Sequence, residues 1–250
     1  MKKFTTQKHG VYLSVVIPAY NESRRIGVTL YNVTVFLKQQ LYTSEIIVVD
    51  DGSTDSLIHV VRKYVEQFPN IRIISYPENR GKGYAVKVGM TSAIGEYRLF
   101  MDADNSVTID HVSKFLLYAE SGYDIVIGSI MLPVTDRVID NSGLHRKFLR
   151  KITKFVRSMI INIDIHDTQR GFKLFSAKAA QKLFSLQRVN RFGFDMELLF
   201  LARMLNYRIK EIAVTWINPA GSKVTTFSYA HSFMELINIR VNMLLNRYDF

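Results

Sequence analysis

Short β-branched runs alternate with longer helical patterns through the first half of the chain, and this alternation most constrains the fold. The runs with strand character lie at 13–18, 45–49, 71–75, 97–101 and 124–127. The segments with helical periodicity lie between them, at 26–40, 56–68, 83–94 and 111–121. Continuous apolar runs of this kind suit a mostly parallel sheet with helices on both faces. The pattern therefore predicts an α/β fold of the nucleotide-binding type.

The strict alternation stops after Gly128, where a basic stretch begins. Further strand and helix patterns follow at 171–184, 194–205 and 209–216, and a helical pattern begins at about 229. No repeat or low-complexity tract interrupts the chain, so we expect one domain with a C-terminal elaboration. The expected parts are a tail (1–12), a domain (13–225) and a C-terminal helix (226–250), with the domain divided into a nucleotide-binding half (13–128), a basic amphipathic segment (129–165) and a second half (166–225).

Composition narrows the class of protein further. With 250 residues, 48% of them hydrophobic, the chain can bury a full core. It has no cysteine, so any metal must bind oxygen or histidine ligands, and a reducing compartment fits. The formal charge of +11 favours nucleic acid, an anionic membrane or a phosphorylated ligand. The sequence shows neither a secretory signal nor an apolar run of the roughly 20 residues that span a bilayer.

Acidic residues follow several of the expected strands. Glu22 comes after the first strand, Asp50 and Asp51 end the second, and Asp102 and Asp104 follow the fourth. Ligands of open α/β sheets bind at the carboxyl ends of the strands, and clustered carboxylates repel unless a cation or hydrogen-bond donors lie between them. On an extended segment, Asp102 and Asp104 project to the same side. They can face one Mg²⁺ or Mn²⁺ ion that bridges to a diphosphate.

Each of these features also has a simpler explanation. Glu22 fits a solvated first helical turn, and a single D-x-D pattern is common by chance. The glycine-rich turn at 79–83 lies at a helix start, where Lys82 could neutralise a phosphate, but a plain helix entry explains it equally well. The chain lacks G-x-G-x-x-G after the first strand and lacks a P-loop, which disfavours a dinucleotide-binding fold.

A family resemblance is carried by ordered motifs along almost the whole chain. VVIPAYNE, IIVVDDGSTD, ENRGKGYA and FMDAD resemble the nucleotide-binding half of the inverting family 2 glycosyltransferases, which have the GT-A fold. HDTQRGFKLF, FGFDMELLFLA and EIAVTWINPAGSKV are similar to the dolichyl-phosphate β-glucosyltransferase branch. Eukaryotic members of that branch glucosylate dolichyl phosphate from UDP-glucose. The resemblance covers about residues 13–245 and makes 166–225 the acceptor half.

The resemblance implies roles for particular residues. Asp102 and Asp104 would bind Mn²⁺ or Mg²⁺, and Arg170 would act as a counter-charge to the diphosphate. Asp195 would face the sugar and acceptor as a base or a positioning group, although a carboxylate that caps the helix start explains it too. The residues implied to bind the nucleotide sugar are Pro18, Ala19, Tyr20, Glu22, Asp50, Asp51, Lys82, Asp102, Ala103, Asp104, Gln169 and Glu197.

Two departures from the family pattern concern the phosphates. Related mannosyl-phosphate synthases often continue the D-x-D with a glutamine in the metal shell, where this chain has Asn105-Ser106. Relatives often place arginine after the Gly-Ser of the fifth strand, where this chain has Ile130. Other cations would then have to bind the phosphate, and the candidates are Arg137, Arg146 and Arg150.

The resemblance implies metal-dependent, inverting transfer of glucose from UDP-glucose to a dolichyl or other polyprenyl phosphate. Two alternatives stay open: GDP-mannose as donor to the same lipid, and transfer to a saccharide hydroxyl in polysaccharide synthesis. A nucleic-acid binder is disfavoured, because the clustered acids would repel phosphates without a metal. The oligomeric state stays open.

A basic segment suggests how the chain reaches a membrane. The stretch 146–162 carries six cations and no acid, and the cations recur at intervals of three and four opposite an apolar stripe. Such a helix suits an anionic membrane surface, although a solvated helix packed on the protein fits as well. We expect peripheral attachment at a cytoplasmic membrane face. The residues expected to contact membrane or lipid phosphate are Arg146, Lys147, Arg150, Lys151 and Lys154.

The C-terminal pattern has two readings of equal weight. Its apolar positions suit either a second interfacial helix or a core helix. They are Phe233, Leu236, Ile237, Val241, Leu244 and Leu245.

Overall fold

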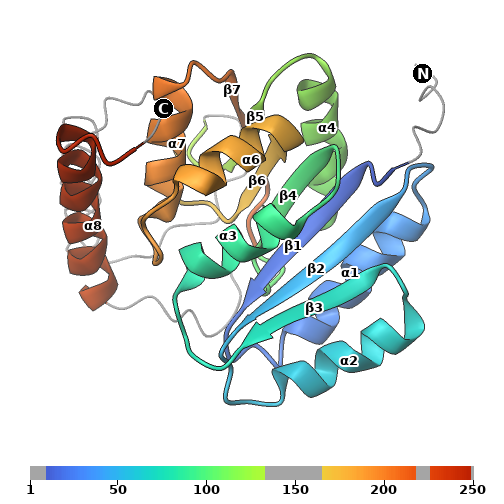
Figure 1. Cartoon of the computed structure of the whole chain (residues 1–250). Coiled ribbons are helices and arrows are strands. Elements are labelled where there is room, and N and C mark those ends of the chain that lie inside the picture. The colour runs from blue at the N-terminus through green and yellow to red at the C-terminus, as the bar shows by residue number, and fades with distance from the viewer. Residues whose placement is uncertain (1–9, 133–164, 218–225, 249–250) are drawn as a thin grey trace.

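The computed structural model describes residues 10–132, 165–217 and 226–248, with backbone alone for 226–233 (Figure 1). The strands are β1 (Leu13–Ala19), β2 (Ser44–Asp51), β3 (Ile71–Tyr76), β4 (Tyr97–Met101), β5 (Ile125–Ser129), β6 (Phe172–Ser176) and β7 (Ile209–Ala213). The helices are α1 (Ile26–Lys38), α2 (Leu57–Gln67), α3 (Lys82–Ser92), the 3₁₀ turn η1 (Ile109–His111), α4 (Val112–Glu120), α6 (Ala177–Leu186), α7 (Phe194–Met204) and α8 (Thr226–Leu244).

The strands of the described residues form one seven-stranded sheet in the order β3-β2-β1-β4-β6-β5-β7. The first four strands in this order are parallel, and β7 is parallel to β5. Strand β6 runs antiparallel to both of its neighbours, β4 and β5. The prediction of a mostly parallel sheet is confirmed. The last strand was expected over 209–216 and ends earlier, at Ala213.

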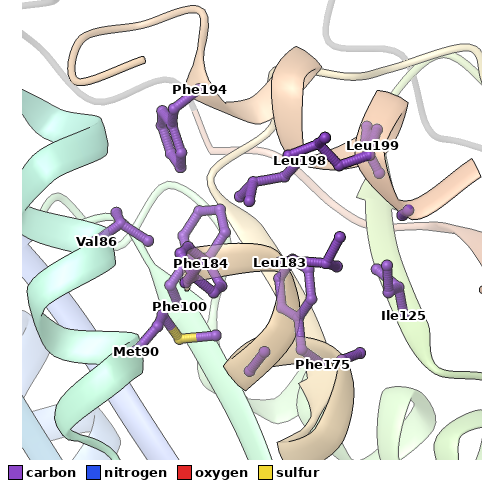
Figure 2. Packing of buried hydrophobic residues seen from close by; sticks show 14 of the residues in the cluster. Val86, Met90, Phe100, Ile125, Phe175, Leu183, Phe184, Phe194, Leu198 and Leu199 are labelled. Atoms are coloured by element: carbon purple, nitrogen blue, oxygen red, sulfur yellow. The ribbon is translucent and has the colours of Figure 1, made fainter. Parts of the chain in front are cut away.

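Helices cover both faces of the sheet, which explains why β1 is buried along its whole length. One buried cluster joins the sheet to α3, α6 and α7, and the other joins it to α1, α2 and α4. Figure 2 shows the first cluster, in which Phe100 of β4 packs among Phe175, Phe184 and Phe194. The aromatic packing fixes α6 and α7 over β4 and β6, and so fixes the start of α7 relative to the end of β4.

The sheet order creates the position of the site. From β1 the chain winds outward through β2 and β3, and then returns to place β4 on the other side of β1. Such a reversal is the switch point at which open α/β sheets bind ligands. The carboxyl ends of β2, β1 and β4 therefore lie side by side, with Ala19 paired with Asp50.

Helix α8 lies beside α7 at one end of the molecule (Figure 1). Leu236 and Ile239 are buried in the core, and Glu235 accepts a hydrogen bond from the Gly193 N–H at 2.8 Å. The opposite side of α8 is apolar and exposed. One side of this segment therefore joins the core, as the core-helix reading predicted, and the interfacial reading stays a prediction. The exposed apolar residues are Met234, Ile237, Val241, Leu244 and Leu245.

No helix in the described part of the chain has the length and apolarity to cross a membrane. The expected basic segment, with Arg146, Lys147, Arg150, Lys151 and Lys154, lies outside the described residues, as does Arg137, and Phe233 is described by its backbone alone.

Candidate active site

Asp51 holds the turn that leads into α3. Its carboxylate accepts hydrogen bonds from the Tyr76 hydroxyl (2.8 Å), the Asn79 amide (2.9 Å), the Arg80 N–H (2.8 Å) and the Gly81 N–H (2.9 Å). Burial raises the pKa of Tyr76, and its hydrogen bond to the Asp51 carboxylate adds to the rise. Asp51 is buried, and both of its carboxylate oxygens accept hydrogen bonds from within the protein.

Asp50 is occupied in the same way. One oxygen accepts from the Ser53 N–H and the other from the Ser75 hydroxyl, both at 2.9 Å. Asn21, in the segment after β1, adopts a positive φ of 54° that asparagine tolerates, and its side chain accepts from the Thr54 N–H at 2.8 Å. These bonds tie the segment after β1 to the segment after β2. Both segments then present one continuous edge.

The turn before α3 requires glycine. Gly81 has a φ of 105°, and a Cβ at this position would lie 2.5 Å from the Asn190 carbonyl oxygen. The helix begins at the next residue, Lys82, one residue before the predicted start at 83. The side chain of Lys82 therefore starts from the amino end of α3, directly beside the carboxyl end of β4.

Asp102 and Asp104 differ from the acids after β2, because cations balance them. The Lys82 ammonium lies 2.6 Å from an Asp102 oxygen, and the Arg25 guanidinium lies 3.9 Å from an Asp104 oxygen. The other Asp104 oxygen accepts from the Ser106 N–H at 3.0 Å. The side chains of Asp102 and Asp104 are 28% and 23% exposed, so solvent and ligands can reach them.

The charges at this edge support one another. Burial lowers the pKa of Lys82, but Asp102 and Asp195 raise it more, so the net pKa of Lys82 is raised. Glu22 forms a two-point ion pair with Arg25, and this bond raises the pKa of the guanidinium. Arg25 thus contacts both Glu22 and Asp104, and the acids lie at one edge of the sheet, as predicted.

The remaining residues of the first motif line the same edge. Pro18 and Ala19 are buried at the end of β1, and Tyr20 is 40% exposed beyond them. Ala103 is buried between the two aspartates, and its carbonyl oxygen accepts from the Thr29 hydroxyl at 2.6 Å.

The turn before β6 contacts the D-x-D directly. The Asp102 N–H donates to the Gly171 carbonyl at 3.1 Å, and a Cβ at Gly171 would lie 2.1 Å from an Asp102 oxygen. Arg170 donates to Asp167 at 3.3 Å, and its guanidinium lies 5.2 Å from the centre of the Trp216 ring. Gln169 is exposed at the tip of this turn. The 167–171 turn is therefore part of the site.

Asp195 lies in the first turn of α7 and is bound by a lysine. Its carboxylate accepts from the Lys173 ammonium at 2.5 Å, and both side chains are buried. The helix is capped by Gly193 without a side-chain bond, so a capping role does not explain Asp195. Burial raises the pKa of Asp195, and the Lys173 and Lys82 ammonium groups oppose the rise.

Glu197 lies apart from these residues. Its carboxylate accepts from the N–H groups of Arg188 and Val189 and from the Tyr248 hydroxyl at 2.7 Å. Residues two positions apart on a helix are rotated by about 200° around its axis and so point in nearly opposite directions, and Asp195 and Glu197 therefore cannot both face one ligand. The structure does not bring Glu197 together with the D-x-D.

The donor set at the D-x-D fits a hard divalent cation. Two part-exposed carboxylates supply oxygen ligands, and the buried Asn105 side-chain oxygen has no hydrogen-bond partner among the described residues. The described residues contain no cluster of three histidine or acidic side chains placed to hold a metal. A cation here would complete its shell with water and phosphate oxygens, as Mg²⁺ and Mn²⁺ do.

Sequence reasoning missed two residues of this site. Arg25 had a signal, because it lies one helical turn after Glu22. Lys173 had a weaker one: it is a lysine inside an apolar run, FKLF, that forms a central strand.

Known structures share the architecture. Glucosyl-3-phosphoglycerate synthase from Mycobacterium tuberculosis, solved with Mn²⁺, UDP and glucosyl-3-phosphoglycerate, matches with a TM-score of 0.67 over 92% of this chain and 80% of that chain, at 17% identity. The fold is therefore the GT-A fold of glycosyltransferases, with the acids at the switch point of its sheet. The family model for glycosyl transferase family 2 matches residues 14–184. The chain belongs to this family and is a glycosyltransferase.

Two relatives are more than a third identical to the chain over the aligned residues. It is 37% identical over 255 aligned residues to a dolichyl-phosphate beta-glucosyltransferase of Trichomonas vaginalis, covering 96% of this chain and 76% of the relative. It is 35% identical over 250 residues to the human dolichyl-phosphate beta-glucosyltransferase, covering 93% and 76%. The family resemblance carried by the motifs is thereby confirmed.

Proposed function

We propose that the chain transfers glucose from UDP-glucose to dolichyl phosphate or another polyprenyl phosphate, with inversion at the anomeric carbon and dependence on Mn²⁺ or Mg²⁺. The observation that carries the proposal is the part-exposed pair of Asp102 and Asp104 with Lys82 beside it, because this set suits a metal-bound diphosphate. The choice of glucose and dolichyl phosphate is supported by the names of the relatives.

In the proposed binding mode, Asp102 and Asp104 hold the cation, and Lys82 contacts the diphosphate. The bound cation supplies Lewis-acid stabilisation to the departing UDP. Arg170 adds positive charge from the 167–171 turn, and Gln169 borders the sugar at its tip. Pro18, Ala19, Tyr20 and Glu22 line the uridine and ribose, while Asp50 and Asp51 shape the edge that closes over them.

The reaction follows from these positions. A phosphate oxygen of the lipid attacks the anomeric carbon from the face opposite UDP, the bond from that carbon to the β-phosphate oxygen breaks, and UDP leaves with the electron pair. The product is a β-linked glucosyl lipid phosphate. A lipid phosphate is already anionic near neutral pH, so the step needs no general base.

Asp195 favours this acceptor over a saccharide hydroxyl. A hydroxyl would require a base, and a base must be accessible to the proton that it removes. The Asp195 carboxylate is buried and bound by Lys173, which suits a group that positions the sugar. GDP-mannose remains the alternative donor. For Glu197 we propose a structural role, because its carboxylate accepts hydrogen bonds from the backbone of residues 188 and 189.

We further propose that the chain works at the cytoplasmic face of a membrane, attached peripherally. The exposed apolar side of α8, which includes Ile237 and Leu244, supports this placement. The basic segment with Arg146, Lys147, Arg150, Lys151 and Lys154 would contact anionic lipid or the lipid phosphate. Neutralising Arg146, Lys147, Arg150 and Lys151 should weaken binding to anionic liposomes, and unchanged partitioning would contradict the proposal.

A transfer assay tests the reaction. Purified protein is incubated with radiolabelled UDP-glucose, a short polyprenyl phosphate in detergent, and Mn²⁺ or Mg²⁺, and label is counted in the organic phase. We expect an acid-labile glucolipid that disappears with EDTA. If a glycolipid forms from GDP-mannose and not from UDP-glucose, the proposed donor is wrong. If no glycolipid forms from either donor, a saccharide acceptor is favoured.

A further inference from the structure

A lysine is buried in the middle of the sheet. Lys173 lies on β6, opposite Phe100 of β4 and Ile127 of β5, and it is 0% exposed. A buried ammonium group loses its hydration, and replacing a buried ion pair by apolar residues is often neutral or stabilising. The fold alone therefore gives no reason to place a lysine in this strand.

The ammonium of Lys173 joins two parts of the site. It donates to the Arg170 carbonyl oxygen at 2.6 Å and to an Asp195 oxygen at 2.5 Å. The first bond reaches the turn before β6, and the second reaches the first turn of α7. Among the described residues, Lys173 is the one side chain that donates a hydrogen bond to Asp195.

The backbone partner of Lys173 connects it to the D-x-D. The turn that Lys173 holds contacts Asp102 through the backbone of Gly171. Asp195, the other partner, forms an ion pair with Lys173, and Lys82 forms one with Asp102.

We propose that Lys173 is a positioning residue of the transfer site, which holds the Asp195 carboxylate and the 167–171 turn in one arrangement relative to the D-x-D. It touches neither donor nor acceptor and acts through Asp195 and the Arg170 backbone. The inference rests on the proposed transfer reaction and adds a residue to it.

The charged groups around Lys173 set its ionisation. Asp195 and Asp167 raise the pKa of Lys173, whereas burial, the largest effect, and Lys82 lower it. Hydrogen bonds to a carbonyl oxygen and a carboxylate at these distances need an N–H donor from Lys173 in either form. The positioning role therefore depends on the amine and its reach.

The test compares Lys173→Met with Lys87→Met in the full chain. Methionine keeps the length and apolar stem of lysine but removes the donor. Lys87 is a matched control, because it also donates to a backbone carbonyl, that of Gln187 at 2.7 Å, outside the site. We expect Lys173→Met to lower kcat about 100-fold, the scale of a misplaced substrate, while UDP affinity stays within about threefold. Lys87→Met should keep both values.

A double-variant cycle with Asp195→Asn separates positioning from support of the fold. Because Lys173 acts through Asp195 as well as through the Arg170 backbone, the loss of kcat in the double variant should be smaller than the two single losses combined. Additive losses of kcat would overturn the inference, as would a Lys173→Met enzyme with unchanged kcat or a parallel loss of UDP affinity and kcat.

If Lys173→Met does not fold, kcat and UDP affinity are measured for Lys173→Arg instead. It keeps the charge and the donors but changes their reach, so kcat should fall at unchanged UDP affinity, and an unchanged kcat would overturn the inference. Failure of the proposed function is seen separately, because the unaltered chain would then form no glucolipid.

Discussion

The acids after β2 and the acids after β4 lie on either side of β1, yet the chain uses them differently. Asp50 and Asp51 are buried, and serine, tyrosine, asparagine and backbone donors occupy their oxygens. Asp102 and Asp104 are part-exposed and lie beside the Lys82 and Arg25 side chains. Carboxylates that accept several backbone hydrogen bonds fix the local backbone conformation. Carboxylates paired with a side-chain cation can instead bind a metal ion in its place. On this ground we propose that the acids after β4, rather than those after β2, bind the metal.

The largest effect should come from Asp104→Asn. The substitution removes a metal ligand but keeps an oxygen that can accept from the Ser106 N–H, so the fold should persist. We expect kcat for glucolipid formation to fall at least about 1,000-fold, because leaving-group stabilisation is lost. The measurement is the transfer assay with thermal unfolding as control. A fully active variant would remove Asp104 from the metal site.

Asp51→Asn should act through the fold instead. An asparagine amide would face donors from Tyr76, Arg80 and Gly81, leaving buried N–H groups without an acceptor. We expect the free energy of unfolding to fall by about 2–4 kcal/mol. Urea unfolding gives the value, and Asp50→Asn, with fewer donors affected, should lose less. Full stability of Asp51→Asn would break the comparison between the two sets of acids.

Lys82→Met should change two affinities in opposite directions. Without its ammonium, Asp102 is free in the nucleotide-free protein, so Mn²⁺ alone should bind several-fold more tightly, while UDP should bind more weakly. Titration calorimetry measures both affinities, with Lys87→Met as control. A weaker affinity for both ligands would mean that Lys82 supports the site without competing with the cation.

The smallest effect concerns Glu197 and pH. Burial raises the pKa of Glu197, and hydrogen bonds from Tyr248 and the backbone oppose the rise. The native state therefore holds this proton at a pH where the unfolded chain has released it, so its contribution to stability grows as pH falls from 7 toward the unfolded pKa. Relative to Glu197→Gln, the unaltered chain should gain stability between pH 7 and 5 in urea unfolding. If the difference in free energy of unfolding between the two proteins stays constant from pH 7 to 5, the raised pKa of Glu197 is contradicted.

The sequence predicted the sheet and its acidic edge because periodicity and strand ends are local features. The strands before Gly128 and the helix start at Lys82 follow from apolar runs and one glycine-rich turn. Parallel strands bring their carboxyl ends together, so the closeness of Glu22 to the D-x-D was also predictable.

Long-range pairing was not predictable in the same way. The bond between Lys173 and Asp195 depends on β6 entering the sheet antiparallel between β4 and β5, which no local pattern encodes. The separation of Asp195 from Glu197 follows from helical geometry, but their shared motif obscured it. The basic segment around Arg150 lies outside the described residues, so its role stays a prediction.

The most direct test of the central claim is a Mn²⁺ titration followed by electron paramagnetic resonance, without nucleotide, on three proteins: the unaltered chain, Asp104→Asn and Asp50→Asn. We expect a saturable Mn²⁺ site in the unaltered chain, which Asp50→Asn keeps and Asp104→Asn loses. Equal Mn²⁺ binding by Asp104→Asn and the unaltered chain would contradict metal binding by Asp104.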